Sequence, residues 1–249
     1  MHVFSDQFNV PLTTNILLAK RLLVDSVYEQ ANLEGISCTF ADTNDILQNI
    51  KSPSTIKPKD ISKICFLRDA WKYLFDHLET ESNLFFVEEI HSIVARADVD
   101  YRNLGRIRQD AVWVSGTKHY QPPIPSSEDI NKLEHKLRID PTDNITEQAV
   151  DAGLYLMRMQ PFMDGNKRVA NFLINKILIQ FGKGLFRIPV EYDTDFKIQL
   201  VNFYDSGDPI ELKNMIFEKF IVCPNEYRIN RTQDTTAVST ESSCKCCRM

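Results

Sequence analysis

The sequence predicts a mainly α-helical fold with one short β-hairpin, and three observations carry this prediction. Glycine is scarce, with 8 among 249 residues, about 3% against roughly 7% in average proteins, which argues against turn-rich sandwiches and barrels. Apolar residues recur at helical spacing along most of the chain. Neither glycine-rich nucleotide fingerprint, G-x-G-x-x-G or G-x-x-x-x-G-K-[ST], occurs, so a glycine-rich dinucleotide-binding fold has no support.

The first 80 residues are expected to form an N-terminal helical region. An apolar stripe at about residues 13–35 indicates its first helix, and Gly35 suits the position after the helix end. A second helix is expected at residues 60–78, with one broad apolar face. A third is expected at residues 82–97, where Ser82 is the candidate N-cap.

The main domain is expected at residues 81–222. Within it, β-branched and aromatic residues surround a central Ser-Gly pair between Arg106 and Tyr120, and this pattern predicts the hairpin. Further helices are expected from residue 126 and at residues 144–160, 165–181, 193–204 and 209–220. Beyond residue 228 the apolar pattern is lost, and we predict that residues 223–249 form a disordered, cysteine-rich tail.

Composition narrows the function classes. Charged residues make up 25% of the chain and apolar residues 43%, which is ordinary globular usage and excludes a wholly disordered protein. The net charge of −5 gives no general attraction for nucleic acid, so no nucleic-acid partner is expected. The cysteines do not form a spaced disulfide framework, and we see neither a secretory signal nor an apolar run of about 18 residues. A cytoplasmic location is therefore predicted.

The segment from Gln160 to Arg168, Q-P-F-M-D-G-N-K-R, joins two of the expected helices. Its second helix begins with unpaired backbone N–H groups, which together with the helix dipole form an anion site. Asp164 at the mouth suits Mg²⁺, which takes few protein carboxylates when phosphates supply other ligands. Lys167 and Arg168 would supply charge for a polyphosphate, and Phe162 would anchor the loop. The simpler interpretation is an N-cap aspartate followed by solvated basic residues.

This segment resembles the signature of the Fic family (the Fic/Doc or Fido fold), H-P-F-x-[DE]-G-N-[GK]-R. Residues 105–123 resemble the family's G-x-[FIL]-R segment and its target-docking hairpin, or flap. Residues 29–36 resemble its inhibitory helix, [ST]-x-x-x-E-[GN], with Glu34 as the inhibitory glutamate. The resemblance covers about residues 12–222, and it implies the Fic helical fold.

The resemblance also implies an activity, the transfer of a nucleoside monophosphate, usually AMP from ATP, onto a hydroxyl of another protein. It makes ATP (or another nucleotide) and Mg²⁺ the expected ligands, with Asp164 holding the metal. The expected nucleotide-binding residues are Phe162, Gly165, Asn166, Lys167 and Arg168. The target protein would dock on the flap as an added strand, and the flap residues are Val112, Trp113, Val114, Gly116 and Thr117.

Three departures from the family pattern bear on this activity. Gln160 stands where the family has its histidine, and a carboxamide is no general base, which predicts catalysis reduced by about 10²–10⁴ or altered. Asn171 stands where many relatives have the arginine that pairs with the inhibitory glutamate, so Glu34 is expected to lack that partner. Gln30 stands where Ser or Thr is usual. His119 in the flap is a candidate substitute base or a solvated surface residue.

Three functions are consistent with this pattern. The first is a Fic-type nucleotidyltransferase with weak or altered catalysis. The second is an inert pseudoenzyme that keeps nucleotide and protein binding, in one version as a bacterial effector directed at a host. The third is a toxin–antitoxin-type regulator in which Glu34 acts as the built-in antidote. A second copy of the chain is a further candidate partner.

The chain ends Cys244-Lys245-Cys246-Cys247-Arg248-Met249. Read as C-a-a-X, this ending predicts farnesylation of Cys246. Palmitoylation of Cys244 or Cys247 would add the second anchor that stable membrane attachment needs. The alternative is a flexible tail with reactive thiols or weak metal capture. A lipidated chain would work in a eukaryotic cytosol, either natively or after delivery by a bacterium.

Overall fold

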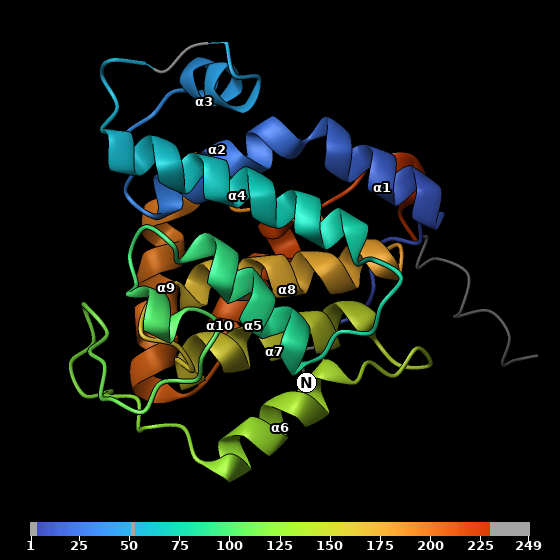
Figure 1. The fold of residues 1–249 in the computed structure, drawn as a ribbon. Coiled ribbons are helices and arrows are strands. Elements are labelled where there is room, and N and C mark those ends of the chain that lie inside the picture. Colours follow the sequence, from blue (N-terminus) through green and yellow to red (C-terminus); the bar gives the residue numbers. More distant parts are fainter. Residues whose placement is uncertain (1–3, 51–52, 230–249) are drawn as a thin grey trace, which may run out of the picture.

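Helix α8, Asn166–Gln180, lies at the centre of the fold (Figure 1). All but two of its 15 residues are buried, and a helix with so little exposed surface must be covered on every side. The covering helices are α1 (Leu12–Arg21), α4 (Pro58–Asp76), α5 (Leu84–Val94) and α7 (Ile145–Met159). The computed structural model describes residues 4–50 and 53–229, and it is mainly helical, which confirms the predicted fold class.

The N-terminal region differs in detail from the prediction. The single helix expected at residues 13–35 is two helices, α1 and α2 (Leu23–Leu33), because Leu22 leaves helical geometry with φ −92° and ψ 13°. Helix α3, Phe40–Leu47, was not predicted. A capping box between Thr39 and Asp42 starts it. Helix α2 packs against α3 and α4, and Glu34 is its C-cap.

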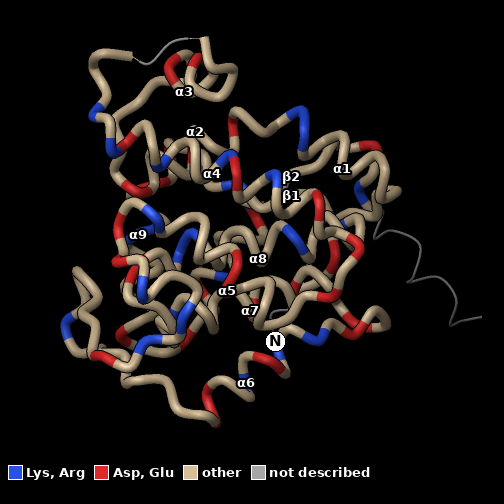
Figure 2. Tube along the Cα trace, viewed as in Figure 1, with Lys and Arg blue, Asp and Glu red and all other residues tan. Residues whose placement is uncertain are grey.

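Two side-chain caps set the start of the next helices. The cap of α5 is Asn83, whose side chain accepts a hydrogen bond from the N–H of Phe86. The expectation of Ser82 was therefore wrong by one residue, since the oxygen at position 83 reaches the first turn. Helix α6, Ser127–Leu137, begins with a capping box between Ser126 and Asp129. Figure 2 shows acidic and basic residues interspersed along most elements, α6 included.

The expected hairpin is an irregular loop. Within the described chain, residues 106–120 contain no strand, although the turn at Ser115 and Gly116 is present. The N–H groups of residues 118–120 donate instead to the Asp205 carboxylate at 2.9–3.2 Å, so they cannot form a strand ladder. We call residues 110–120 the flap loop. The small antiparallel sheet pairs β1 (Leu185–Phe186) with β2 (Ile221–Val222).

Two further helices and a π-helical turn form the C-terminal part of the described fold. Helix α9 spans Asp193–Ser206, and α10 (Ile210–Met215) continues into a π-helical turn, Ile216–Phe220. Three short 3₁₀ segments complete the described elements, at Tyr101–Asn103, Val190–Tyr192 and Asn225–Tyr227. None of the described helices is both long and apolar enough to cross a bilayer.

The predicted tail lies only partly within the described residues. Residues 223–229 are described, and Arg228 forms an isolated antiparallel bridge with Phe8. This stretch therefore contacts the N-terminal segment, in contrast to the tail predicted from residue 223. Residues 230–249, including Cys244, Cys246 and Cys247, lie outside the described residues. The division of the chain near residue 80 stays a prediction.

Candidate functional site

The loop between α7 and α8 is held in an uncommon backbone conformation. Helix α7 ends at Gln160, whose φ of 49° and ψ of 62° are left-handed, which is rare for a residue with a side chain. Gly165, just before α8, is also left-handed, with φ 80°. Such conformations persist only where surrounding contacts enforce them, and they concentrate at binding and active sites.

Asn166 closes this loop with its carboxamide. Its Oδ1 accepts from the N–H of Phe162 at 2.9 Å, and its Nδ2 donates to the Phe162 carbonyl at 2.9 Å. The same Nδ2 donates to Oε1 of Gln160 at 2.8 Å. Because the side chain is buried, these bonds are protected from water and hold the loop rigid.

A buried histidine contacts the loop through a ring stack and a hydrogen bond. His91 on α5 stacks face to face on Phe162, with ring centroids 3.9 Å apart and planes 5° apart. Its Nδ1 accepts from the N–H of Gly105 at 2.9 Å, and its Nε2 lies 3.1 Å from the Asp164 carbonyl and donates to it. Burial lowers the pKa of His91 to about 4, so the ring is neutral at pH 7. Phe162 itself is fully buried and has no surface to offer a ligand.

The two basic residues of the loop are paired with carboxylates. Glu34, at the end of α2, forms ion pairs with Lys167 at 3.3 Å and with Arg168 at 3.2 Å. Arg168 also pairs with Asp98 at 2.9 Å and donates to the Val94 carbonyl at 2.7 Å. From the sequence, Glu34 is expected to lack its arginine partner at position 171. The structure pairs it instead with Arg168, one turn earlier on α8.

The other two departures from the family pattern contact each other. Gln30 on α2 donates from Nε2 to Oδ1 of Asn171 at 2.5 Å, and Asn175 donates to the same oxygen at 3.0 Å. Neutral amides thus join α2 to α8 here. Nearby, Arg187 binds Glu29 of α2 through two nitrogens at 2.9 and 2.5 Å. Both contacts hold the helix that carries Glu34.

A cavity of about 380 Å³ opens at the N-terminus of α8. It lies between the end of α2, the flap loop, the α8 start and α9. The lining residues are Glu34, Trp113, Val114, Ser115, Gln160, Asp164, Gly165, Asn166, Lys167, Lys197, Leu200, Val201 and Tyr204. The structure therefore brings most of the predicted loop residues together with the flap loop.

Some predicted site residues do not line this cavity. Phe162, Arg168 and Val112 are buried and are absent from the lining. Gly116 and Thr117 belong to the flap loop beyond the lining. Conversely, the α9 residues of the lining, from Lys197 to Tyr204, were not foreseen as site residues. The sequence pattern that predicted α9 gives no signal for which of its faces meets a cavity.

Bonds to protein groups surround Gln160. Its Nε2 donates to the Met157 carbonyl at 2.6 Å and reaches the Tyr204 hydroxyl at 3.4 Å, while its Oε1 accepts from Asn166. Burial raises the pKa of Tyr204 well above its ordinary value, so that hydroxyl stays protonated at neutral pH. His119 is exposed and lies outside the cavity lining. Gln160 therefore has no basic atom to offer, and His119 does not line the cavity, so neither Gln160 nor His119 supplies a general base in this arrangement.

Asp164 is the carboxylate at the cavity mouth. Its side chain is 59% exposed, and its Oδ1 accepts from the N–H of Gly165 at 2.5 Å. Among the described residues there is no cluster of three or more His, Cys, Asp or Glu side chains that could hold a metal. A single exposed carboxylate fits Mg²⁺ only when a bound polyphosphate supplies further oxygens.

At this site a helix N-terminus faces a cavity, with a left-handed glycine before it, and such an arrangement can bind an anion through the helix dipole and the first backbone N–H groups. Residues 83–178 match the model of the Fic/DOC family. These residues form a Fic/DOC domain, and the resemblance drawn from the sequence is confirmed.

Relatives with known names carry the same domain. The chain is 27% identical over 169 residues to "Protein adenylyltransferase Fic" of Drosophila virilis, covering 66% of this chain and 34% of that protein. It is 26% identical over 169 residues to the Aedes aegypti protein of the same name, with coverage of 66% and 33%. The chain thus spans about a third of the length of these curated relatives.

Solved structures share the fold. Fic-1 (residues 134–508) from C. elegans superposes with a TM-score of 0.71 at 22% identity, covering 83% of this chain and 62% of that one. A Fic-domain signalling protein from Bacteroides thetaiotaomicron gives a TM-score of 0.62 at 18% identity, covering 77% and 75%. Both comparisons cover more of the chain than the matched domain.

Proposed function

We propose that the chain binds a nucleoside triphosphate at the N-terminus of α8 and slowly transfers AMP, or a related phosphoryl-linked group, to a protein hydroxyl. The observation that carries this proposal is the cavity in which Asp164, Gly165, Asn166 and Lys167 face the flap loop. The relatives named protein adenylyltransferase support the reaction class.

The phosphates would bind where the helix dipole and the first N–H groups of α8 point into the cavity. Lys167 lines the cavity there, and Arg168 is buried beside the lining residue Glu34. Both now pair with Glu34. Because a phosphate and the Glu34 carboxylate compete for the same two cations, nucleotide binding requires that Glu34 withdraw.

Asp164 would hold Mg²⁺ together with the phosphates. Its exposed carboxylate lies at the mouth, beside the α8 start. The metal would supply charge neutralisation for the leaving pyrophosphate. The protein's own contribution is the placement of the carboxylate, which His91 and Asn166 secure by fixing the loop on either side of it.

In the transfer, the target hydroxyl oxygen bonds to the α-phosphorus, the bond to pyrophosphate breaks, and the hydroxyl proton passes to solvent. A histidine at position 160 would take that proton, which is typically worth about 10²–10⁴ in rate. Gln160 can only accept or donate a hydrogen bond. The rate would then come from proximity and from phosphate stabilisation at the helix start.

The target protein would dock on the flap loop. Trp113 lines the cavity while 80% of its surface is exposed, and a large aromatic side chain kept in water beside a site is typical of a contact residue. The loop is already fixed to α9 by Asp205. A docked strand would therefore meet a preorganised surface.

A second candidate function is an inert module that binds nucleotide and protein without transfer. The observation that favours it is the Gln160 carboxamide, whose nitrogen and oxygen both bond protein groups. Incubation with α-labelled ATP, Mg²⁺ and a proteome separates the two functions. Label on a protein hydroxyl with the wild type supports transfer. Nucleotide binding without any label, and activity only in Gln160→His, supports the inert module.

A further inference from the structure

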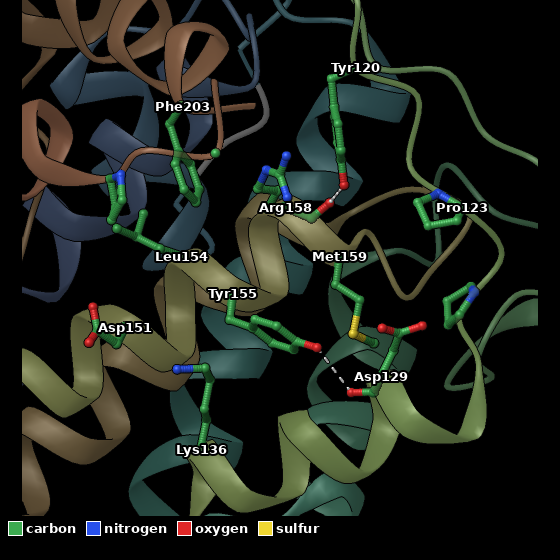
Figure 3. A pocket seen from close by; sticks show the side chains of 13 residues that line it. Tyr120, Pro123, Asp129, Lys136, Asp151, Leu154, Tyr155, Arg158, Met159 and Phe203 are labelled. Atoms are coloured by element: carbon green, nitrogen blue, oxygen red, sulfur yellow. Dashed lines mark hydrogen bonds between the residues drawn. The ribbon is translucent and has the colours of Figure 1, made fainter. Parts of the chain in front are cut away.

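A second cavity, of about 410 Å³, lies at the C-terminal end of α7 (Figure 3). It is enclosed by α6, α7, the chain that leaves the flap loop, and the turn between α9 and α10. None of its lining residues belongs to the cavity at the α8 N-terminus. The two are therefore separate sites, and the end of α7 stands between them.

The walls of this cavity are mainly apolar. Leu154, Met159 and Phe203 are buried side chains that line it. Tyr120 and Tyr155 add two aromatic faces, and Figure 3 shows both tyrosines beside the open space. A concave apolar surface of this size, with a few polar groups, is typical of a ligand site.

Two cations in the lining have no carboxylate partner among the described residues. The Arg158 guanidinium lies over the Tyr120 ring, 4.4 Å from its centroid, and Lys136 Nζ lies 5.6 Å from the Tyr155 centroid. The Arg158 backbone carbonyl also accepts from the Tyr120 hydroxyl at 2.6 Å. Aromatic rings leave the positive charge of both side chains available to an anion.

The two carboxylates of the lining are already engaged. Asp129 accepts hydrogen bonds from the backbone and the hydroxyl of Ser126 at 2.9 and 2.6 Å. Asp151 pairs with Lys213 at 2.9 Å. Asp129 keeps its negative charge, because the Ser126 groups that bond it are neutral. The charged groups of the lining that form neither an ion pair nor a hydrogen bond to Ser126 are Lys136 and Arg158, and a ligand carboxylate would be placed beside these two.

We propose that this cavity binds an aromatic side chain flanked by a carboxylate, on a segment of the protein that docks on the flap loop. Continuity supports a polypeptide: Tyr120 ends the flap loop, and Pro123 and Pro125 of the same chain segment form the cavity rim. Arg108 holds this rim by donating to the Pro123 carbonyl at 2.6 Å. The inference rests on the docking part of the proposed function and names the kind of segment selected.

The binding test uses short peptides of matched charge. We would titrate ¹⁵N-labelled full-length protein with Gly-Glu-Phe-Glu-Gly and map the amide shifts. Gly-Gln-Phe-Gln-Gly and Gly-Lys-Phe-Lys-Gly are the charge controls, and Gly-Glu-Gly-Glu-Gly lacks the ring. The expected result is shifts at α6 and α7 with the first peptide and weaker binding for each control. Equal binding by the charge controls, or shifts confined to other surfaces, would overturn the proposal.

Three variants test the cations. Lys136→Gln should raise the Kd of the acidic peptide about threefold and Arg158→Gln about tenfold, because each variant loses a charged contact; these changes correspond to about 0.6 and 1.4 kcal/mol of binding free energy. Lys132→Gln is the matched control, since Lys132 lies on the same helix outside the cavity and pairs with Glu128 at 2.7 Å. An equal effect of Lys132→Gln, or none from the other two, would refute the role of the cations.

Two further measurements separate this proposal from its alternatives. 3-Phenylpropanoate offers the same ring and carboxylate as a free acid. If it binds more tightly than the peptide, the cavity is a small-acid site and the polypeptide proposal is wrong. Binding of Mg²⁺–ATP by each variant is measured in parallel. If the wild type does not bind Mg²⁺–ATP, the proposed nucleotide function alone is refuted, because the peptide titration does not depend on nucleotide.

Discussion

Replacing Glu34 with glutamine tests the electrostatic arrangement at the α8 N-terminus. Glu34 faces Lys167 and Arg168 across ion pairs of 3.3 and 3.2 Å, and its side chain is 15% exposed. Glutamine keeps the size of the side chain and removes its charge. We expect tighter binding of Mg²⁺–ATP, since the phosphates no longer compete with a carboxylate for the two cations.

The size of this effect follows from the geometry. At about 3.2 Å and an effective dielectric constant of about 20, each pair has a Coulomb energy of about 5 kcal/mol. Most of this is returned when the displaced carboxylate regains its hydration and the phosphates replace it. The net coupling between two such sites is typically about 1–3 kcal/mol, which is an affinity gain of about 5–150-fold.

Isothermal titration of the full chain with Mg²⁺–ATP measures this gain directly. Glu79→Gln is the matched control, because Glu79 is exposed and lies outside the cavity lining. Its affinity should equal that of the wild type. An affinity of Glu34→Gln equal to or below the wild type, with the fold intact, would refute the reasoning. The nucleotide would then bind without displacing Glu34.

Three more predictions follow from other contacts. Gln160→His should raise label transfer from α-labelled ATP by about 10²–10⁴, and an unchanged rate would show that position 160 does not limit the reaction. Asp205→Asn should speed amide exchange in residues 113–120, because a neutral side chain holds the three N–H groups of the flap loop less strongly; Mg²⁺–ATP affinity should not change. Burial lowers the pKa of His91 to about 4 in the folded state. Between about pH 4 and pH 6.5 the unfolded state therefore binds more protons at this residue than the folded state does. Stability should therefore rise by about 3 kcal/mol over that interval, and urea titrations of His91→Phe should lose this pH dependence while the ring stack with Phe162 is kept.

Local sequence patterns predicted most of the helices, because the apolar period and the caps are properties of neighbouring residues. The helix at residues 60–78 was predicted within two residues of α4, and the start of α6 follows from the Ser126 cap. The loop from Gln160 to Arg168 was predicted for the same reason. Its proline, glycine and charged residues are close neighbours in the chain. The loop lies within residues 83–178, which match the Fic/DOC family model.

Contacts between distant segments could not be predicted in this way. The flap loop is irregular because Asp205, 85 or more residues away, takes its N–H groups. The approach of α2 to α8 brings Glu34 to Arg168. The neutral amide of Asn171 accepts a hydrogen bond from Gln30 between the same two helices. None of these contacts has a signal at short range.

The sequence by itself determined a helical fold, a loop that resembles the Fic signature and the absence of a histidine at position 160, since each is carried by adjacent residues. Tertiary structure alone decided which groups that loop faces. It stacked His91 on Phe162 and paired Lys167 and Arg168 with Glu34. It also formed the second cavity, which α6 and α7 line. The physical reason is that burial and ion pairing depend on distances in space, which the order of residues along the chain does not specify.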